Sequence, residues 1–146
     1  MKKLLNTLKH NFTFHNSQFT IILPMTIYQK KASALERRTV VFSVQLIKQL
    51  GVYSGDKVLK SLISQVVRSA TSIGANYAEA NNASSKQDFK NKIYISKKEA
   101  AETRYWLTVL QELLPTEDLS KLRQEALELT LIFQKIVSSL KMANAK

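Results

Sequence analysis

Four long segments of the chain carry apolar residues at the spacing of an α-helix. They span about residues 33–50, 57–82, 86–114 and 117–142. In each segment the apolar side chains recur every three or four residues, which places them along one face of a helix. The sequence holds only three Gly and two Pro, whereas a β-sandwich or barrel needs a turn about every ten residues. The pattern predicts an all-α fold.

The residues that flank these segments are typical of helix ends. The expected N-caps are Ser33 (in a capping box with Glu36), Ser54 or Asp56, Ser85 and Thr116. Gly51 and Pro115 follow the first and third helices, at positions where helices usually stop. Because the connections are short, consecutive helices must be antiparallel neighbours. We therefore expect an up-down-up-down antiparallel four-helix bundle over residues 33–146.

The apolar faces identify the expected core. They comprise Leu35, Val41, Phe42, Leu46 and Leu50 on the first helix, Leu59, Leu62, Ile63, Val66, Ala70, Ile73, Tyr77 and Ala80 on the second, and Phe89, Ile93, Ser96, Ala100, Thr103, Leu107, Leu110 and Leu114 on the third. Gly74 lies inside the second helix, where Gly costs roughly 1 kcal/mol relative to Ala. We expect it where another backbone comes close.

One flank of the third helix is basic. It holds Lys86, Lys90, Lys97 and Arg104, with Arg68, Lys92 and Lys98 nearby. Spacings of four and seven residues place the first four within about 40° of one another around the helix. Such a row suits nucleic-acid phosphates, and Tyr94 or Tyr105 can stack on bases. The competing interpretation is that these lysines are ordinary solubilising residues of an exposed helix.

The other flank is apolar and acidic. It comprises Ile95, Glu99, Glu102, Trp106, Val109 and Leu113. A monomeric bundle helix needs one apolar face, so this second face predicts an interface with another copy of the chain, since large aromatic residues are enriched in interfaces. Glu99 and Glu102 would then pair with Arg37 or Arg38 of the next subunit. The alternative is that Trp106 folds back over its own chain.

Residues 1–32 differ from the rest of the sequence. They contain five Lys, no acidic residue, both histidines and no sustained period. Polar residues interrupt any apolar core of a signal peptide, and Phe19–Leu23 is too short to span a membrane. We expect a basic, loosely ordered segment. Two alternatives remain: Met25 is the natural start, or residues 19–23 form a strand that pairs with a neighbouring chain.

The positive charge is local. The net charge is +11, and residues 1–98 hold 16 Lys and Arg against 4 Asp and Glu, whereas residues 99–146 hold 6 against 7. The absence of Cys excludes a disulfide framework and fits a reducing, cytoplasmic location. We expect no membrane association, because no segment is long and apolar enough to span a bilayer.

Residues with catalytic or metal-binding patterns are few. Di-iron bundles use Glu-x-x-His pairs that face the core, whereas Glu99-x-x-Glu102 lacks the histidine and lies off the core face. There is no Gly-rich phosphate loop and no nucleophile elbow. Paired carboxylates alone can bind a hard cation, but on helix surfaces they are usually solvated. We expect a protein that is not an enzyme and has no metal or cofactor.

Residues on the second and third predicted helices carry a resemblance to a known protein family. The residues that carry it are Arg68-Ser69-Ala70, Ser72-Ile73 and Asn76-Tyr77-Ala78-Glu79-Ala80, then Phe89, Lys92-Ile93, Ser96, Glu99-Ala100, Glu102-Thr103 and Tyr105-Trp106-Leu107. Over about residues 38–142 the chain resembles the four-helix-bundle family of 23S rRNA intervening-sequence proteins. That family is similar to the accessory variability protein of diversity-generating retroelements. This chain departs from the commoner pattern in having Ala80 in place of Gly and no Pro near Gly74.

The resemblance implies a ring-like homopentamer with a basic surface and no established enzymatic activity. Two functional hypotheses follow. In the first, the oligomeric bundle binds the backbone of RNA or DNA through its basic surface. In the second, it is a scaffold or adaptor that docks a partner enzyme and has no direct role with nucleic acid. A salt-dependent gel shift favours the first, and copurification of one protein partner without nucleic acid favours the second.

Overall fold

The computed structural model describes residues 33–53 and 55–143, with side chains described through residue 140. The elements are α3 (Ala34–Leu50), the 3-10 turn η1 (Gly51–Tyr53), α4 (Lys57–Asn81), α5 (Lys86–Leu113) and α6 (Ser120–Ala143). The helices belong to one unit, Ala34–Lys146. No strand occurs in the part of the chain that the structure describes, which confirms the all-α class. The predictions for residues 1–32 and for Ser54 lie outside the described residues.

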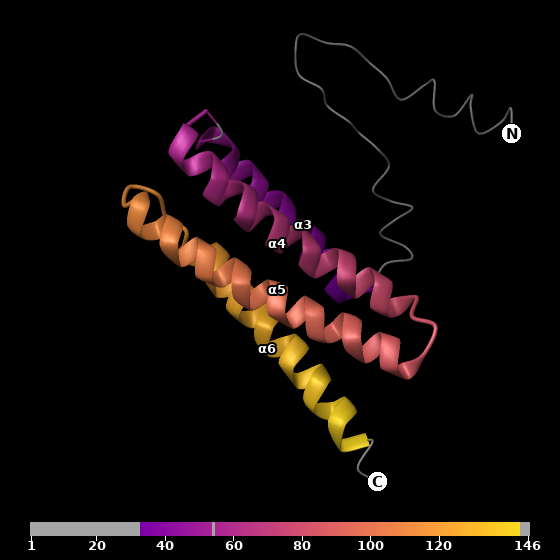
Figure 1. Cartoon of the computed structure of the whole chain (residues 1–146). Coiled ribbons are helices and arrows are strands. Elements are labelled where there is room, and N and C mark those ends of the chain that lie inside the picture. The colour runs from indigo at the N-terminus through magenta and orange to yellow at the C-terminus, as the bar shows by residue number, and fades with distance from the viewer. Residues whose placement is uncertain (1–32, 54, 144–146) are drawn as a thin grey trace, which may run out of the picture. The chain divides into compact units, whose positions relative to one another are not determined.

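The four helices run alternately up and down (Figure 1). α4 packs most extensively on α5, α5 packs on α6, and α3 packs on α4. The contact of α3 with α6 is slighter and includes polar bonds. There Arg38 forms ion pairs with Glu125 and Glu128, and the Gln49 side chain donates to the Asp118 carbonyl at 3.0 Å. These bonds connect the first helix to the last.

Two predicted caps are confirmed and one is wrong. The Asp56 carboxylate accepts from the Val58 and Leu59 amides at 2.8 and 3.0 Å, and Ser85 Oγ accepts from the Asp88 amide at 3.1 Å. The fourth helix, however, begins at Ser120 rather than after Thr116.

The reason for the later start is a turn at residues 115–119. The Gln111 side chain holds this turn, because its amide donates to the Glu117 carbonyl at 2.7 Å and its oxygen accepts from the Leu119 amide at 2.9 Å. Asp118, and not Thr116, then accepts from the first helical amide, that of Ser120, at 3.0 Å.

The core contains the residues that the helical period predicts. The predicted residues of α4 and α5 are buried or packed against the core. Val41 is the exception on α3: it is 47% exposed, so its assignment to the core was wrong. It lies one residue before the fully buried Phe42 and therefore points about 100° away from it.

Small and polar residues bring α4 close to its two neighbours. A Cβ added at Gly74 would lie 2.8 Å from Thr39 Oγ1 and 4.0 Å from the Thr39 carbonyl carbon of α3, so α3 comes close here with a side chain, rather than its backbone, as the nearest contact. On the opposite side, buried Ser96 donates to the Ile73 carbonyl at 3.2 Å, and Thr103 Oγ1 lies 2.9 Å from Ser69 Oγ. These bonds satisfy polar groups that would otherwise be costly to bury.

Candidate nucleic-acid interface

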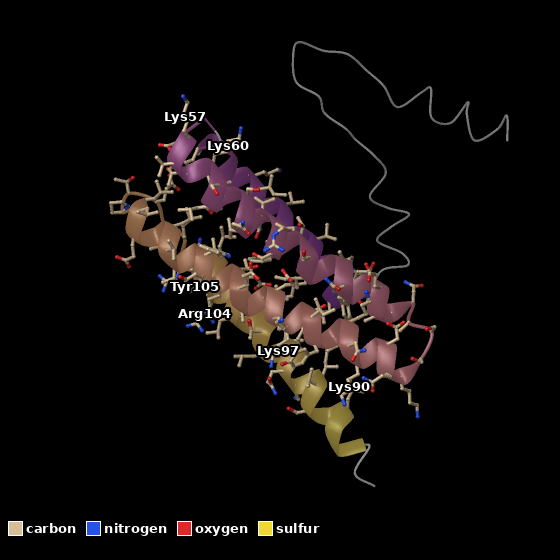
Figure 2. The ribbon with its side chains drawn as sticks, viewed as in Figure 1. Lys57, Lys60, Lys90, Lys97, Arg104 and Tyr105 are labelled. Carbon is tan, nitrogen blue, oxygen red and sulfur yellow. The ribbon has the colours of Figure 1, made fainter. Side chains whose placement is uncertain are left out.

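The exposed face of α5 next to α6 carries a row of cations. This row, called here the basic stripe, comprises Lys86, Lys90, Lys97 and Arg104; the fifth cation, Lys98, lies about 100° around the helix from them, toward Glu99. Figure 2 shows Lys90, Lys97 and Arg104 in succession along the helix. Among the described residues, no acid forms an ion pair with any of the five. Lys97 Nζ instead donates to Gln134 Oε1 of α6 at 2.9 Å and lies 5.1 Å from the centre of the Tyr94 ring.

Acids of α6 and of the first turn of α5 have partners other than the stripe. Glu125 and Glu128 of α6 both bind Arg38, whose pKa their hydrogen bonds raise, Glu125 most. The Asp88 carboxylate accepts from the Ser84 amide and hydroxyl, at 3.2 and 3.3 Å. The positive charge of the stripe is therefore left largely uncompensated by the described part of the chain.

Two tyrosines accompany the cations. Tyr94 is 49% exposed and Tyr105 is 60% exposed, and eleven residues separate them, which is close to three full helical turns. They therefore lie on the same side of α5. Both rings present apolar surface to solvent beside the positive charges, which is the combination used to bind single-stranded nucleic acid.

The structure does not bring Arg68 and Lys92 into the stripe. Arg68 donates to Glu102 at 3.0 Å, and Lys92 forms an ion pair with Glu79 of α4. The hydrogen bond to Glu79 raises the pKa of Lys92. Both cations lie where α5 packs against α4, on the side of the helix opposite α6. The sequence alone did not show these pairings, because the partners of each pair are on different helices.

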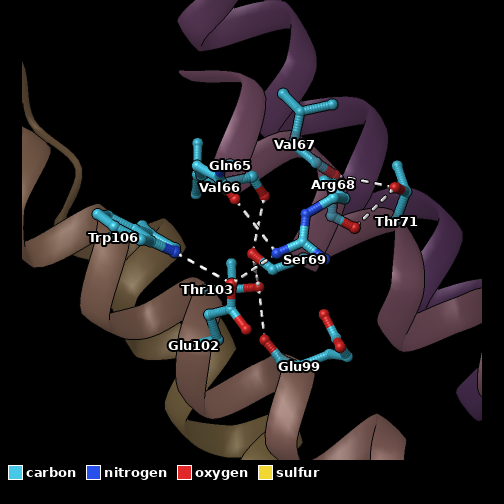
Figure 3. A network of polar contacts seen from close by, with 10 residues as sticks. All are labelled: Gln65, Val66, Val67, Arg68, Ser69, Thr71, Glu99, Glu102, Thr103 and Trp106. Carbon is cyan, nitrogen blue, oxygen red and sulfur yellow. Dashed lines mark hydrogen bonds and ion pairs between the residues drawn. The ribbon is translucent and has the colours of Figure 1, made fainter. Parts of the chain in front are cut away.

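The apolar and acidic flank of α5 is partly covered by its own chain. Trp106 is half-buried and packs against the core, and its Nε1 donates to Glu102 Oε1 at 3.2 Å. Glu102 thereby joins Arg68 and Trp106 in one polar network (Figure 3). Ile95 is 36% exposed and Leu113 is 51% exposed, whereas Val109 is half-buried.

Glu99 lies within this flank without a hydrogen-bond partner for one of its oxygens. Its Oε2 is buried. Burial raises the pKa of Glu99 and the nearby Glu102 carboxylate raises it further. Arg38, one of the expected partners of the two glutamates, is instead bound to Glu125 and Glu128 within the same chain.

A second exposed apolar surface lies on α3 and was not predicted. Val40, Val41, Val44 and Ile47 are between 36% and 47% exposed. They recur at one, four and seven residues after Val40, which forms a stripe beside the core face of that helix. The available signal was the set of β-branched residues Thr39, Val40, Val41 and Val44. We refer to these four residues as the α3 stripe.

The described residues form neither a metal-binding cluster nor a membrane span. No group of three or more His, Cys, Asp or Glu side chains is arranged to hold a metal ion among the residues that the structure describes. None of the described helices has the length and apolarity needed to cross a bilayer.

Comparison with known proteins shows the family to which the chain belongs. The family described as "23S rRNA-intervening sequence protein" matches residues 31–135. A crystal structure of a protein with unknown function from the S23 ribosomal protein family of Bacteroides thetaiotaomicron is similar, with a TM-score of 0.66 and 29% identity. The match covers 71% of this chain and 98% of that one. No curated protein matched. The chain belongs to the family of 23S rRNA-intervening sequence proteins.

Proposed function

We propose that this protein is a non-enzymatic, oligomeric bundle that binds the backbone of RNA or DNA through the basic stripe. The observation that supports this most is the absence of ion-pair partners for Lys86, Lys90, Lys97, Lys98 and Arg104 among the described residues. The other two cations of the predicted surface, Arg68 and Lys92, are paired with acids. Unpaired cations in a row attract a polyanion and release its counterions on binding.

The dimensions of the stripe favour an extended polyanion over a small anion. Lys86 and Arg104 are 18 residues apart, which corresponds to about 27 Å along a helix. Tyr94 lies within that length, Tyr105 lies one residue beyond it, and both are exposed, so bases can stack beside the phosphate contacts. The family name refers to 23S rRNA, which makes a cytoplasmic RNA a reasonable first ligand to test.

The assembly that we propose is a homo-oligomeric ring, pentameric as the resemblance implies. A ring needs two different surfaces that meet head to tail. The chain has two exposed apolar surfaces, the α3 stripe and the flank with Ile95 and Leu113. The buried, unpartnered oxygen of Glu99 lies on the second surface, where a cation of the next subunit would satisfy it.

The test compares two double variants with the same change in charge. Lys97→Gln/Arg104→Gln removes two cations from the stripe, and Lys92→Gln/Arg68→Gln removes two cations that are paired with acids. We expect the first to weaken a gel shift with RNA or DNA and to lower the log–log salt slope by about 1.8 for duplex DNA. The second should change the slope far less.

The outcome separates the two functional hypotheses. Equal slopes for the two double variants would contradict the proposed interface. Failure of the wild type to shift either RNA or DNA at low salt would contradict the proposed function as a whole. A single protein partner that copurifies in the absence of nucleic acid would then favour the scaffold or adaptor role.

A further inference from the structure

A cavity lies at one end of the basic stripe, where α4 turns into α5. Its volume is about 550 Å³, within the range of small-molecule sites. Its principal walls are Ala80 and Ala83 from the end of α4 and the turn, Lys86, Phe89 and Lys90 from the start of α5, and Leu140 from α6. α6 diverges from α5 toward this end of the bundle (Figure 1). The cavity therefore lies among three helices rather than on one.

The walls of the cavity combine apolar surface and positive charge with the neutral polar side chains of Asn81, Ser85 and Gln87. Phe89 is half-buried and packs against the core, and with Leu140 and Ala80 it provides apolar surface. Lys86 and Lys90 provide positive charge. A ligand with an apolar part and an anionic part matches the apolar and the charged walls.

The two lysines repel each other, and no acid of the described chain forms an ion pair that would offset the repulsion. They are four residues apart on α5, so their side chains are neighbours, and like charges at this spacing destabilise a helix. No acid among the described residues forms an ion pair with either one. The closest acid in sequence, Asp88, directs its carboxylate to Ser84. A bound anion would remove the repulsion.

We infer that this cavity binds one nucleoside monophosphate unit, with the phosphate at Lys86 and Lys90 and the base against Phe89 and Leu140. The inference rests on the proposed function, because the two lysines are also the first cations of the basic stripe. A strand that follows the stripe would place one unstacked nucleotide in the cavity. A free nucleotide has the same chemistry and is the other possible source.

The probe is adenosine 5′-monophosphate, titrated into the full chain and followed by NMR through the Leu140 methyl and Phe89 ring resonances. Adenosine and inorganic phosphate are titrated separately. We expect the monophosphate to shift both residues, and each fragment to bind more weakly. Equal binding by phosphate alone, or shifts that do not include Phe89 and Leu140, would overturn the inference.

Two variants test the site, each with a matched control. Ala83→Phe fills the cavity without altering a charge, and Ala75→Phe adds the same ring on the exposed face of α4. Lys86→Gln/Lys90→Gln removes the two cations of the cavity, and Lys57→Gln/Lys60→Gln removes two at the other end of the bundle (Figure 2). We expect each cavity variant to weaken monophosphate binding about fivefold or more; for Ala83→Phe this is the lower end of what one base stack contributes.

The same variants separate this inference from the proposed function. An Ala83→Phe protein that melts like the wild type and still binds the monophosphate equally would overturn the inference. If no monophosphate binds but Lys97→Gln/Arg104→Gln still lowers the salt slope of the gel shift, the cavity inference fails and the proposed function stands. If the monophosphate binds and no oligonucleotide does, the free nucleotide is the ligand and the proposed function fails.

Discussion

The two flanks of α5 contain the same kinds of charged residue in opposite situations. Beside α4, Arg68 and Lys92 meet Glu102 and Glu79 across the helix interface. Beside α6, Lys97 meets only an amide and an aromatic ring. The difference shows that a count of cations on a helix does not measure the charge available to a partner. What matters is whether the helix packed opposite supplies acids.

The acids of the bundle are concentrated where they connect its helices. Glu125 and Glu128 bind Arg38 of α3, while Glu117 accepts from the Tyr53 hydroxyl at 2.6 Å. The hydrogen bond to Glu117 raises the pKa of Tyr53. These acids are therefore engaged in connections to α3 and η1, at a distance from the stripe. The stripe retains its charge for that reason.

The largest expected effect comes from removing most of the stripe. Replacing Lys86, Lys90, Lys97 and Arg104 together by Gln should lower the log–log salt slope for duplex DNA by about 3.6, because each lost phosphate contact removes about 0.9. The helical content should not change, since these residues have no ion-pair partner in the described chain. Circular dichroism and gel shifts at several salt concentrations measure both. An unchanged slope would contradict the stripe.

A smaller effect is expected on the opposite flank from Trp106→Ala. The indole packs against the core and donates to Glu102, so we expect a loss of about 2–3 kcal/mol, below the 3–5 kcal/mol of a fully buried aromatic residue. The bundle should remain helical. If this flank also contacts a second subunit, sedimentation should shift from oligomer toward monomer.

The matched control for this variant is Trp106→Phe. It keeps an aromatic ring and loses the bond to Glu102 and part of the apolar surface of the indole, so the oligomer should persist. A wild type that sediments as a monomer at tens of micromolar would contradict the proposed assembly, whatever the stability of the variants.

The sequence predicted those features that depend on neighbours along the chain. The Asp56 and Ser85 caps act two to three residues away, and the core faces follow from the helical period. The start of α6 was missed because Gln111, on the preceding helix, holds the turn before it.

Contacts between residues far apart in the sequence also limited what could be predicted about the candidate site. Periodicity placed Lys86, Lys90, Lys97 and Arg104 on one side of α5, but it carries no information about the partners that α4 and α6 supply. The pairing of Arg68 with Glu102 joins residues 34 positions apart, and that of Lys92 with Glu79 joins two helices. Val41 was placed in the core because a stripe of β-branched residues lies next to the true core face.

The smallest and most discriminating effect concerns Glu99, which lies on the same flank as Trp106. In the single chain its pKa is raised, by burial first and by Glu102 second. The folded state therefore binds this proton more tightly than the unfolded state does, so wild-type stability falls as the pH rises from the ordinary Glu range into the raised one. Glu99→Gln keeps the uncharged form. We expect it to stabilise the isolated chain at pH 7 and to have little effect near pH 3.

Assembly would reverse the sign of this effect. If a cation of the next subunit pairs with Glu99, the ionised form is favoured in the oligomer, because an opposite charge lowers a carboxyl pKa. Glu99→Gln would then weaken the oligomer at pH 7, and the difference from wild type would shrink as the pH falls. Denaturant unfolding of dilute protein and sedimentation of concentrated protein, each at pH 3 and pH 7, distinguish the two cases. A stabilising effect of Glu99→Gln on both the single chain and the oligomer at pH 7 would mean that no cation meets Glu99 across an interface.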